Sequence, residues 1–158
     1  MQLTDEFAIH VAPDRAFELL LDLENVAHCV PGGEIDPPDG DGVYPGRVIV
    51  KLGPMRFSYA GTLRVTERDA VARRAVIEGA GQASGGAERA RVRSVMEVLP
   101  EGEGSRVRMT TDLDIRGRAA QMGAGIIGAV SRQMVKQAAS CLEARLEERA
   151  ATSSTDGR

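Results

Sequence analysis

Hydrophobic and polar residues alternate through most of the chain between residues 43 and 115, in runs separated by short loops rich in glycine, proline and acidic residues. Alternation with a period of two is typical of strands that bury one face. The pattern predicts strands over residues 2–11, 43–52, 55–67, 72–81, 88–99 and 105–115, with a short one near Ile35. Because short loops join these strands, we expect a seven-stranded antiparallel sheet.

The loops between the strands predict how two of the hairpins pair. A turn between Gly102 and Glu103 would bring opposite charges together on one face in the pairs Arg93–Asp112, Arg91–Asp114 and Glu97–Arg108. The same register would pair Val98–Val107, Met96–Met109, Ser94–Thr111 and Val92–Leu113 on the other face. A turn at Gly53-Pro54 would likewise pair Leu52–Met55, Val50–Phe57 and Val48–Tyr59. A slip by one residue would destroy both patterns, so the sheet is predicted to have one apolar and one charged face.

Helical patterns occupy the two parts of the chain that flank these strands. Ala12-Pro13-Asp14 predicts the start of a helix, and Asp22 or Asn25 is expected to cap a second short helix that ends near Cys29. Residues 118–149 carry apolar side chains in steps of three or four, which predicts one helix of roughly 45–50 Å. A sheet with one apolar face has to be covered, and this helix is the expected cover. The fold class is therefore predicted to be α+β.

Composition narrows the class of protein. At 158 residues the chain is expected to form one domain, residues 1–150, followed by a disordered polar tail, residues 151–158. A net charge of −3 and an aromatic content of only 3% argue against nucleic-acid binding. Cys29 and Cys141 have no metal-ligand spacing, and two thiols do not make a disulfide framework. With no signal peptide or long apolar run in the sequence, we expect a soluble cytoplasmic protein.

The candidate binding site is a cavity between the sheet and the long helix. Gly79 and Gly81 remove volume from the predicted inner face, and methionines suit an adaptable apolar pocket, although they are equally common as core filler. The predicted cavity residues are Leu20, Val50, Met55, Phe57, Tyr59, Ile77, Gly79, Met96, Met109, Met122, Ile126, Ile127 and Val130. The run 123–128 matches G-x-G-x-x-G, but no strand follows it as a dinucleotide fold requires. We interpret its glycines as lowering the profile of the helix, which leaves room for a ligand or allows close packing.

Residues suited to catalysis are few. On the predicted inner face only Tyr59, Ser94 and Thr111 carry polar groups, and no metal site is predicted. His28 and Cys29 are sequence neighbours, which rarely contact each other on a helix, so their role stays open. The outer face carries many arginines, which form either a solvated, ion-paired surface or a docking surface for an acidic partner or anionic lipid headgroups.

Four short segments resemble one protein family. They are Val26-Ala-His-Cys-Val-Pro-Gly-Gly-Glu34, Val50-Lys-Leu-Gly-Pro54, Gly61-Thr-Leu-Arg-Val65 and Gly117-Arg-Ala-Ala-Gln-Met-Gly123. In this order they resemble the family of the carbon monoxide dehydrogenase G-subunit, within the SRPBCC (START/polyketide-cyclase, helix-grip) superfamily. The resemblance implies a curved seven-stranded sheet wrapped around a long C-terminal helix, with two short helices after the first strand. It also implies a hydrophobic-ligand cavity and association with a molybdenum-containing hydroxylase or dehydrogenase.

The leading hypothesis is a non-catalytic accessory or carrier protein that binds a quinone-like or lipid-like molecule and serves a carbon monoxide dehydrogenase-type enzyme. The alternatives are a small cyclase- or hydrolase-type enzyme that uses the same cavity, and an assembly factor with no ligand. Some family members end in a membrane-binding extension, whereas only polar residues follow the predicted helix here. We therefore expect no anchor, and at most peripheral contact with the inner face of the membrane.

Overall fold

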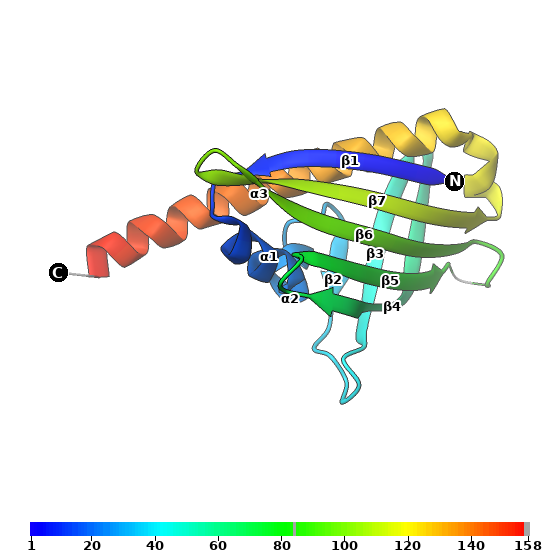
Figure 1. Ribbon diagram of the computed structural model, residues 1–158. Coiled ribbons are helices and arrows are strands. Elements are labelled where there is room, and N and C mark those ends of the chain that lie inside the picture. The colour runs from blue at the N-terminus through cyan, green and yellow to red at the C-terminus, as the bar shows by residue number, and fades with distance from the viewer. Residues whose placement is uncertain (84, 157–158) are drawn as a thin grey trace.

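The computed structural model describes residues 1–83 and 85–156, and side chains as far as residue 147. One sheet contains seven antiparallel strands in the order β1-β7-β6-β5-β4-β3-β2 (Figure 1). The strands are β1 (Gln2–Ile9), β2 (Gly33–Ile35), β3 (Tyr44–Leu52), β4 (Met55–Asp69), β5 (Arg74–Gln82), β6 (Arg89–Glu101) and β7 (Gly104–Arg116). The α+β fold class and the seven-stranded sheet are thus confirmed.

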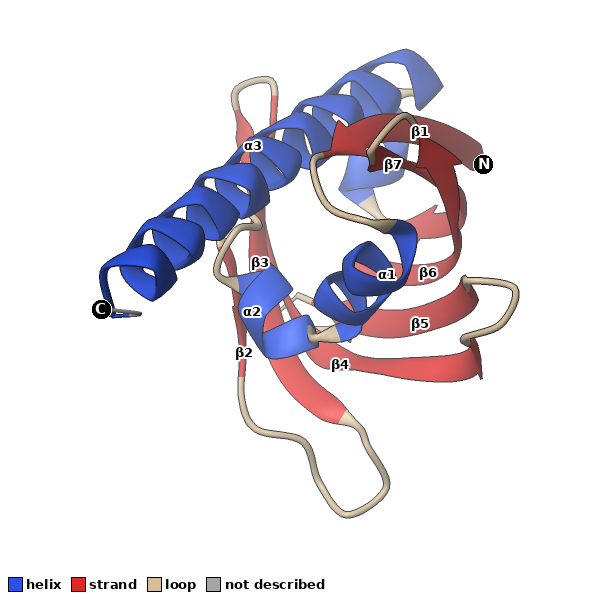
Figure 2. Cartoon of the chain, turned by 60° about the vertical axis from the view of Figure 1, so that its left-hand side comes forward, coloured by secondary structure: helices blue, strands red, loops and turns tan. Residues whose placement is uncertain are grey.

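Two short helices follow β1, as predicted. They are α1 (Pro13–Leu21), which begins with a proline and buries most of one face, and α2 (Leu23–Ala27). The carboxylate of Asp22 accepts the backbone N–H of Asn25 at 3.3 Å, so Asp22 is the cap of α2. Both helices lie within the mouth of the curved sheet, and the long C-terminal helix passes along its open side (Figure 2).

The long helix differs from the prediction at both ends. The segment starts with a 3₁₀ turn, η1 (Arg118–Met122), and the α-helix α3 (Ala124–Asp156) begins only after Gly123. Gly123 has a φ of 88°, which the right-handed helix cannot accommodate, so the segment is interrupted there. The helix continues to Asp156, so the prediction of a disordered tail from residue 151 is wrong for residues 151–156. The physical reason is that each residue added to a nucleated helix gains a backbone hydrogen bond. Residues 157–158 of the predicted tail lie outside the described residues. No helix in the described part of the chain is both long and apolar enough to cross a membrane.

Both predicted hairpin registers are confirmed residue for residue. Some ion pairs nevertheless differ from the cross-strand pairs that the register suggested. Arg93 lies opposite Asp112, but its guanidinium is 3.8 Å from Glu78 on the other neighbouring strand. Arg108 pairs with Glu6 of β1 at 2.9 Å. A long side chain in the middle of a sheet can reach either of the two flanking strands. The register alone therefore does not determine which strand provides its ion-pair partner.

The hydrophobic core consists of two clusters along the inner face of the sheet. The first joins α1 to β6, β7 and the C-terminal half of α3, around the buried side chains of Phe17, Met96, Val107 and Leu142. The second joins the β3–β4 hairpin to η1 and the start of α3, around Leu52, Phe57, Ala119 and Ile127. Two stretches of α3, around Ile127 and Leu142, therefore pack against the rest of the core.

Cys29 and Cys141 form a disulfide, a pairing that the sequence did not predict. Their Cα atoms are 5.4 Å apart although 112 positions separate them in the sequence. Cys29 lies two residues beyond the end of α2 and Cys141 lies in α3, so the bond ties the short helices to the long one. Spacing along the chain could not reveal this pair, because the sheet lies between its members in the sequence.

Candidate functional site

A cavity of about 240 Å³ lies between α2 and the strongly curved strands β2 to β6. Its roof consists of Leu23, Val26 and Ala27 of α2, together with Val30. Its walls include Ile35, Val48, Tyr59, Leu63 and Val92 from the sheet. Nearly all of these side chains are apolar, so the cavity suits a ligand with a hydrophobic body.

A row of glycines creates the empty space. Gly46 of β3 lies opposite Gly61 of β4, which in turn lies opposite Gly81 of β5. All three line the cavity, as does Gly79 one row further along β5. A side chain at Gly61 would overlap the carbonyl oxygen of Ala80, so β4 and β5 approach each other here as only glycine allows. Because these positions lack side chains, the backbone itself forms the cavity floor.

Tyr59 is the side chain in the cavity wall that carries a buried hydroxyl. It is 8% exposed, and its ring stacks on that of Phe57 with the centroids 6.4 Å apart. The hydroxyl has no hydrogen-bond partner among the described residues. Burial, and to a smaller extent the charge of Glu88, raise the pKa of Tyr59 above its ordinary value of 10. The phenol therefore stays protonated at neutral pH and is free to donate a hydrogen bond.

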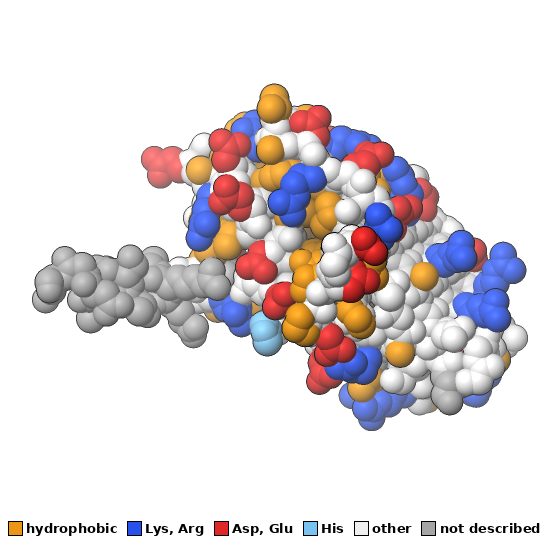
Figure 3. Space-filling view, turned by 90° about the horizontal axis from the view of Figure 1, so that it is seen from below, with side chains coloured by type: hydrophobic (Ala, Val, Ile, Leu, Met, Phe, Trp, Pro, Cys, Tyr) orange, Lys and Arg blue, Asp and Glu red, His pale blue; other side chains and the backbone are white. Residues whose placement is uncertain are grey.

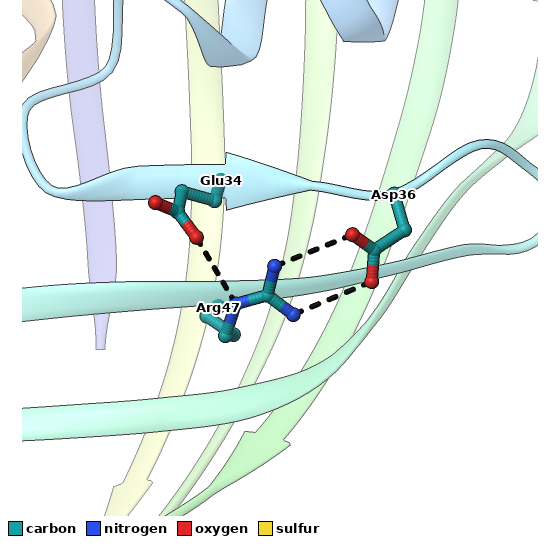
Figure 4. A network of polar contacts seen from close by, with 3 residues as sticks. All are labelled: Glu34, Asp36 and Arg47. Atoms are coloured by element: carbon teal, nitrogen blue, oxygen red, sulfur yellow. Dashed lines mark hydrogen bonds and ion pairs between the residues drawn. The ribbon is translucent and has the colours of Figure 1, made fainter.

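Charged groups at the cavity rim are engaged with one another. The guanidinium of Arg47 donates to Glu34 at 3.2 Å and to both carboxylate oxygens of Asp36 at 3.3 Å (Figure 4). The hydrogen bonds that Arg47 donates to Asp36 and Glu34 raise the pKa of Arg47. This network lies on the exposed side of β2 and β3 and holds the short strand β2 in place below the roof. Its role is structural support of the cavity edge.

The cavity lies beneath α2, whereas the sequence predicted one beneath α3. Of the predicted cavity residues, Tyr59 and Gly79 line the cavity. Leu20, Ile77, Met96 and Met109 belong to the first core cluster, and Val50, Met55, Phe57, Met122, Ile127 and Val130 belong to the second. Ile126 is 44% exposed. The side chains of α3 fill the space next to the sheet, so the helix that leaves room for a ligand is α2.

The remaining sequence candidates also lie outside the cavity. A side chain at Gly125 would meet nothing within 4 Å, so this glycine faces open space and does not make room for a ligand. Ser94 and Thr111 share a hydrogen bond of 2.9 Å between their hydroxyls and satisfy each other. His28 is exposed, and Cys29 is consumed by the disulfide, so the two do not form a catalytic pair.

The sequence did not predict the roof of the cavity or three of the glycines in its lining, Gly33, Gly46 and Gly61. The roof positions in α2 carry no distinctive signal, because a five-residue helix has too few positions for a meaningful periodicity. The glycines did leave a signal. The predicted turn at Gly53-Pro54 already implied that Gly46 lies opposite Gly61, and paired glycines on an inner face indicate missing volume.

A curled antiparallel sheet that grips a long C-terminal helix, with two short helices at its mouth and an apolar cavity beneath them, defines a START/SRPBCC-like helix-grip protein. The family model of CoxG, the G-subunit of carbon monoxide dehydrogenase, matches residues 6–147. The chain belongs to this family, as the four sequence segments had suggested.

Similar solved structures support the fold. A conserved protein from Geobacillus kaustophilus is 13% identical, with a TM-score of 0.81 over 94% of this chain and 96% of that one. The Zhui aromatase/cyclase from Streptomyces sp. R1128 is also 13% identical, with a TM-score of 0.65 over 92% and 95% of the two chains. A START superfamily protein from Mycobacterium smegmatis is 11% identical, with a TM-score of 0.61 over 93% and 97%. No curated protein matches the chain. At these identities the likeness concerns the fold alone.

Proposed function

We propose that this protein is a non-catalytic carrier that binds a small, ring-bearing hydrophobic molecule of the quinone type in the cavity beneath α2. The support for the proposal is an apolar cavity with Tyr59 in its wall. The hydroxyl of Tyr59 has no partner among the described residues and is shielded from solvent, so the side chain would have to turn for a ligand to reach it. An unsatisfied buried hydroxyl costs about 1–3 kcal/mol. A ligand oxygen that accepts its hydrogen bond would recover that cost.

The volume sets the size of the ligand. An engineered apolar cavity of about 150 Å³ holds benzene, so the 240 Å³ cavity here suits about two fused rings. The carbonyl of such a ring would accept the hydrogen bond from Tyr59, and any long apolar tail would have to extend beyond the cavity. A quinone headgroup fits this description, and so does a lipid-like molecule with a ring at one end.

Two probes of equal ring size test the proposal. Menadione has two fused rings and quinone oxygens, whereas naphthalene has the rings alone. We expect the purified protein to bind both in calorimetric titrations. Tyr59→Phe should weaken menadione binding by about 2- to 12-fold, the equivalent of one hydrogen bond, and should leave naphthalene binding unchanged. The proposal would be refuted if neither probe bound, or if the substitution weakened the binding of both probes equally.

We further propose that the carrier serves a molybdenum-containing dehydrogenase, in peripheral contact with the cytoplasmic face of a membrane. The support is the family, whose name describes a component of carbon monoxide dehydrogenase. The test is the rate at which such a purified enzyme reduces menadione. Adding this protein should raise the rate, and adding a Gly79 variant with reduced cavity volume should raise it less.

A cyclase- or hydrolase-type enzyme is the second candidate, because the Zhui aromatase/cyclase shares the fold. The charge states in the cavity favour a carrier instead. The pKa of Tyr59 is raised, so its phenol is a poor general base at neutral pH, and the rim charges of Arg47 and Glu34 neutralise each other. Native mass spectrometry of the protein as purified separates the three hypotheses. Unchanged co-purified ligand supports a carrier, a converted ligand supports an enzyme, and an empty protein that binds neither probe supports an assembly factor.

A further inference from the structure

We propose that the protein has a second binding site, a groove at the β3–β4 hairpin end that takes the anionic group of an amphiphilic molecule. This hairpin-end groove has a volume of about 850 Å³ and is open to solvent. Its lining includes Pro54, Met55, Arg56, Phe57, Glu88 and Arg118. None of these lines the cavity beneath α2, although the two spaces adjoin at Ala60.

The groove holds two cations without a carboxylate partner. Arg56 and Arg118 both line it and are exposed, and neither takes part in an ion pair within the described part of the chain. The acid in the groove, Glu88, is committed elsewhere. Its two oxygens accept the backbone N–H groups of Arg118 at 2.6 Å and of Ala119 at 3.2 Å, which fixes the start of η1. The guanidinium groups are therefore available to an anion from solution.

Like charges face each other across the strands at this end of the sheet. Lys51 lies directly opposite Arg56 in the β3–β4 hairpin, and Arg89 lies directly opposite Arg116 between β6 and β7. Directly opposed like charges destabilise a sheet, so folding alone does not account for two such pairs. Asp114 lies 3.7 Å from Arg116 and reduces the repulsion in the Arg89–Arg116 pair only.

The excess of positive charge is local. Further along the sheet several arginines have acidic partners, as where Arg106 and Arg108 each bond to Glu6 at 2.9 Å. Seen from below, Lys and Arg side chains gather at the right-hand end of the molecule, where the β5–β6 connection lies, whereas red and blue side chains mingle elsewhere on this face (Figures 1 and 3). The net charge of the whole chain is −3, so this end is basic although the protein as a whole is acidic.

An apolar wall lies beside the cations. Nη2 of Arg118 is 4.0 Å from the sulfur of Met55, so the guanidinium rests against the methionine side chain. Pro54, which is exposed, continues this surface. A ligand that matches both parts carries a phosphate or carboxylate group for the arginines and an apolar segment for the wall. Such a ligand is either a free amphiphilic anion or the headgroup region of an anionic lipid.

The test compares soluble and membrane-bound anions. Decyl phosphate below its micellar concentration and decyl maltoside serve as the charged and neutral soluble probes. Phosphatidylglycerol–phosphatidylcholine vesicles and pure phosphatidylcholine vesicles serve as the charged and neutral membranes. The test variant is Arg56→Ser/Arg118→Ser. The matched control, Arg64→Ser/Arg68→Ser, removes the same charge from exposed positions of β4 that do not line the groove.

We expect the wild type and the control variant to bind the charged probe more tightly than the neutral one, with an affinity that falls as salt is added. The test variant should bind about tenfold more weakly and lose most of the salt dependence, since each arginine–anion contact contributes a few-fold. Binding of decyl phosphate assigns the site to free anions, and binding of phosphatidylglycerol vesicles alone assigns it to lipid headgroups.

Equal binding of charged and neutral probes would overturn the inference, and so would equal losses in the test and control variants. The result is independent of the carrier proposal. The arginine substitutions should leave menadione binding unchanged, and Tyr59→Phe should leave decyl phosphate binding unchanged. Thermal unfolding of each variant verifies that the exposed substitutions leave the fold intact.

Discussion

The disulfide between Cys29 and Cys141 connects the segment that roofs the cavity to the long helix that closes the sheet. Cys29 is 5% exposed and adjoins Val30, which lines the cavity. Five residues of α2 would otherwise be held mainly by α1 and the short strand β2. The bond therefore restrains the cavity roof from the side that α1 and β2 leave free.

Removing this bond should lower the stability of the protein. A crosslink that closes a long loop restricts the unfolded chain, and native disulfides typically contribute about 2–4 kcal/mol. For a loop spanning 112 positions, Cys29→Ala/Cys141→Ala is expected to lower the free energy of unfolding by about this amount. Urea unfolding measures the change. Dithiothreitol should destabilise the wild type similarly and have no effect on the double variant. Alkylation of two cysteines in the native, unreduced protein would contradict the bond.

Adding a methyl group at Gly79 should reduce ligand affinity. A Cβ there would come within 3.0 Å of Cδ1 of Leu63 and 3.1 Å of Cγ1 of Val92, so it would press on the cavity walls. We expect Gly79→Ala to weaken menadione binding, because the methyl group narrows the cavity, and to lower the free energy of unfolding by about 1–3 kcal/mol, the usual cost of overpacking. Gly125→Ala is the control, because a side chain there meets nothing within 4 Å. It should stabilise α3 by about 0.5–1 kcal/mol and leave binding unchanged. If Gly79→Ala bound menadione as tightly as the wild type does in a calorimetric titration, the ligand would have to lie elsewhere.

Replacing Lys51 by glutamate should stabilise the fold at the expense of anion binding. Lys51→Glu turns the like-charge pair with Arg56 into an attractive one, which is worth about 0.2–1 kcal/mol. Urea unfolding should show the gain, and the titration with decyl phosphate should show weaker binding. In a background of Arg56→Ser the gain should vanish, since the cross-strand partner is gone. A gain that persists in that background would show that the Lys51–Arg56 repulsion is not its source.

Glu6 should make stability depend on pH in the acid range. Hydrogen bonds from Arg108 and Arg106 lower the pKa of Glu6 below 4.5, so the folded chain binds this proton more weakly than the unfolded chain does. The stabilisation is fully present above about pH 4.5 and is lost as pH falls through the lower folded-state pKa. In urea unfolding at a series of pH values, Glu6→Gln should flatten the acid limb. Glu103→Gln, at the exposed β6–β7 turn, should leave it unchanged.

The sequence by itself determined the strands, their pairing and the layer architecture. Strand alternation and tight turns are local properties, and the turn at Gly102-Glu103 fixes every pairing of β6 with β7 by simple counting. The same counting from Gly53-Pro54 implies the glycine pair Gly46–Gly61 that forms the cavity floor. The family could be inferred because its short motifs also lie in local segments of the chain.

The tertiary structure decided which helix covers the cavity, which cysteines meet and which charges remain unpaired. The alternation of side chains predicts an inner face but not how tightly the sheet curls, and the curl determines that α3 packs directly on the sheet while α2 spans empty space. Arg56 and Arg118 are far apart in the sequence and come together only when the hairpin end folds against η1. Each of these features depends on contacts between distant segments, whose geometry follows from the packing of the whole sheet rather than from any local pattern.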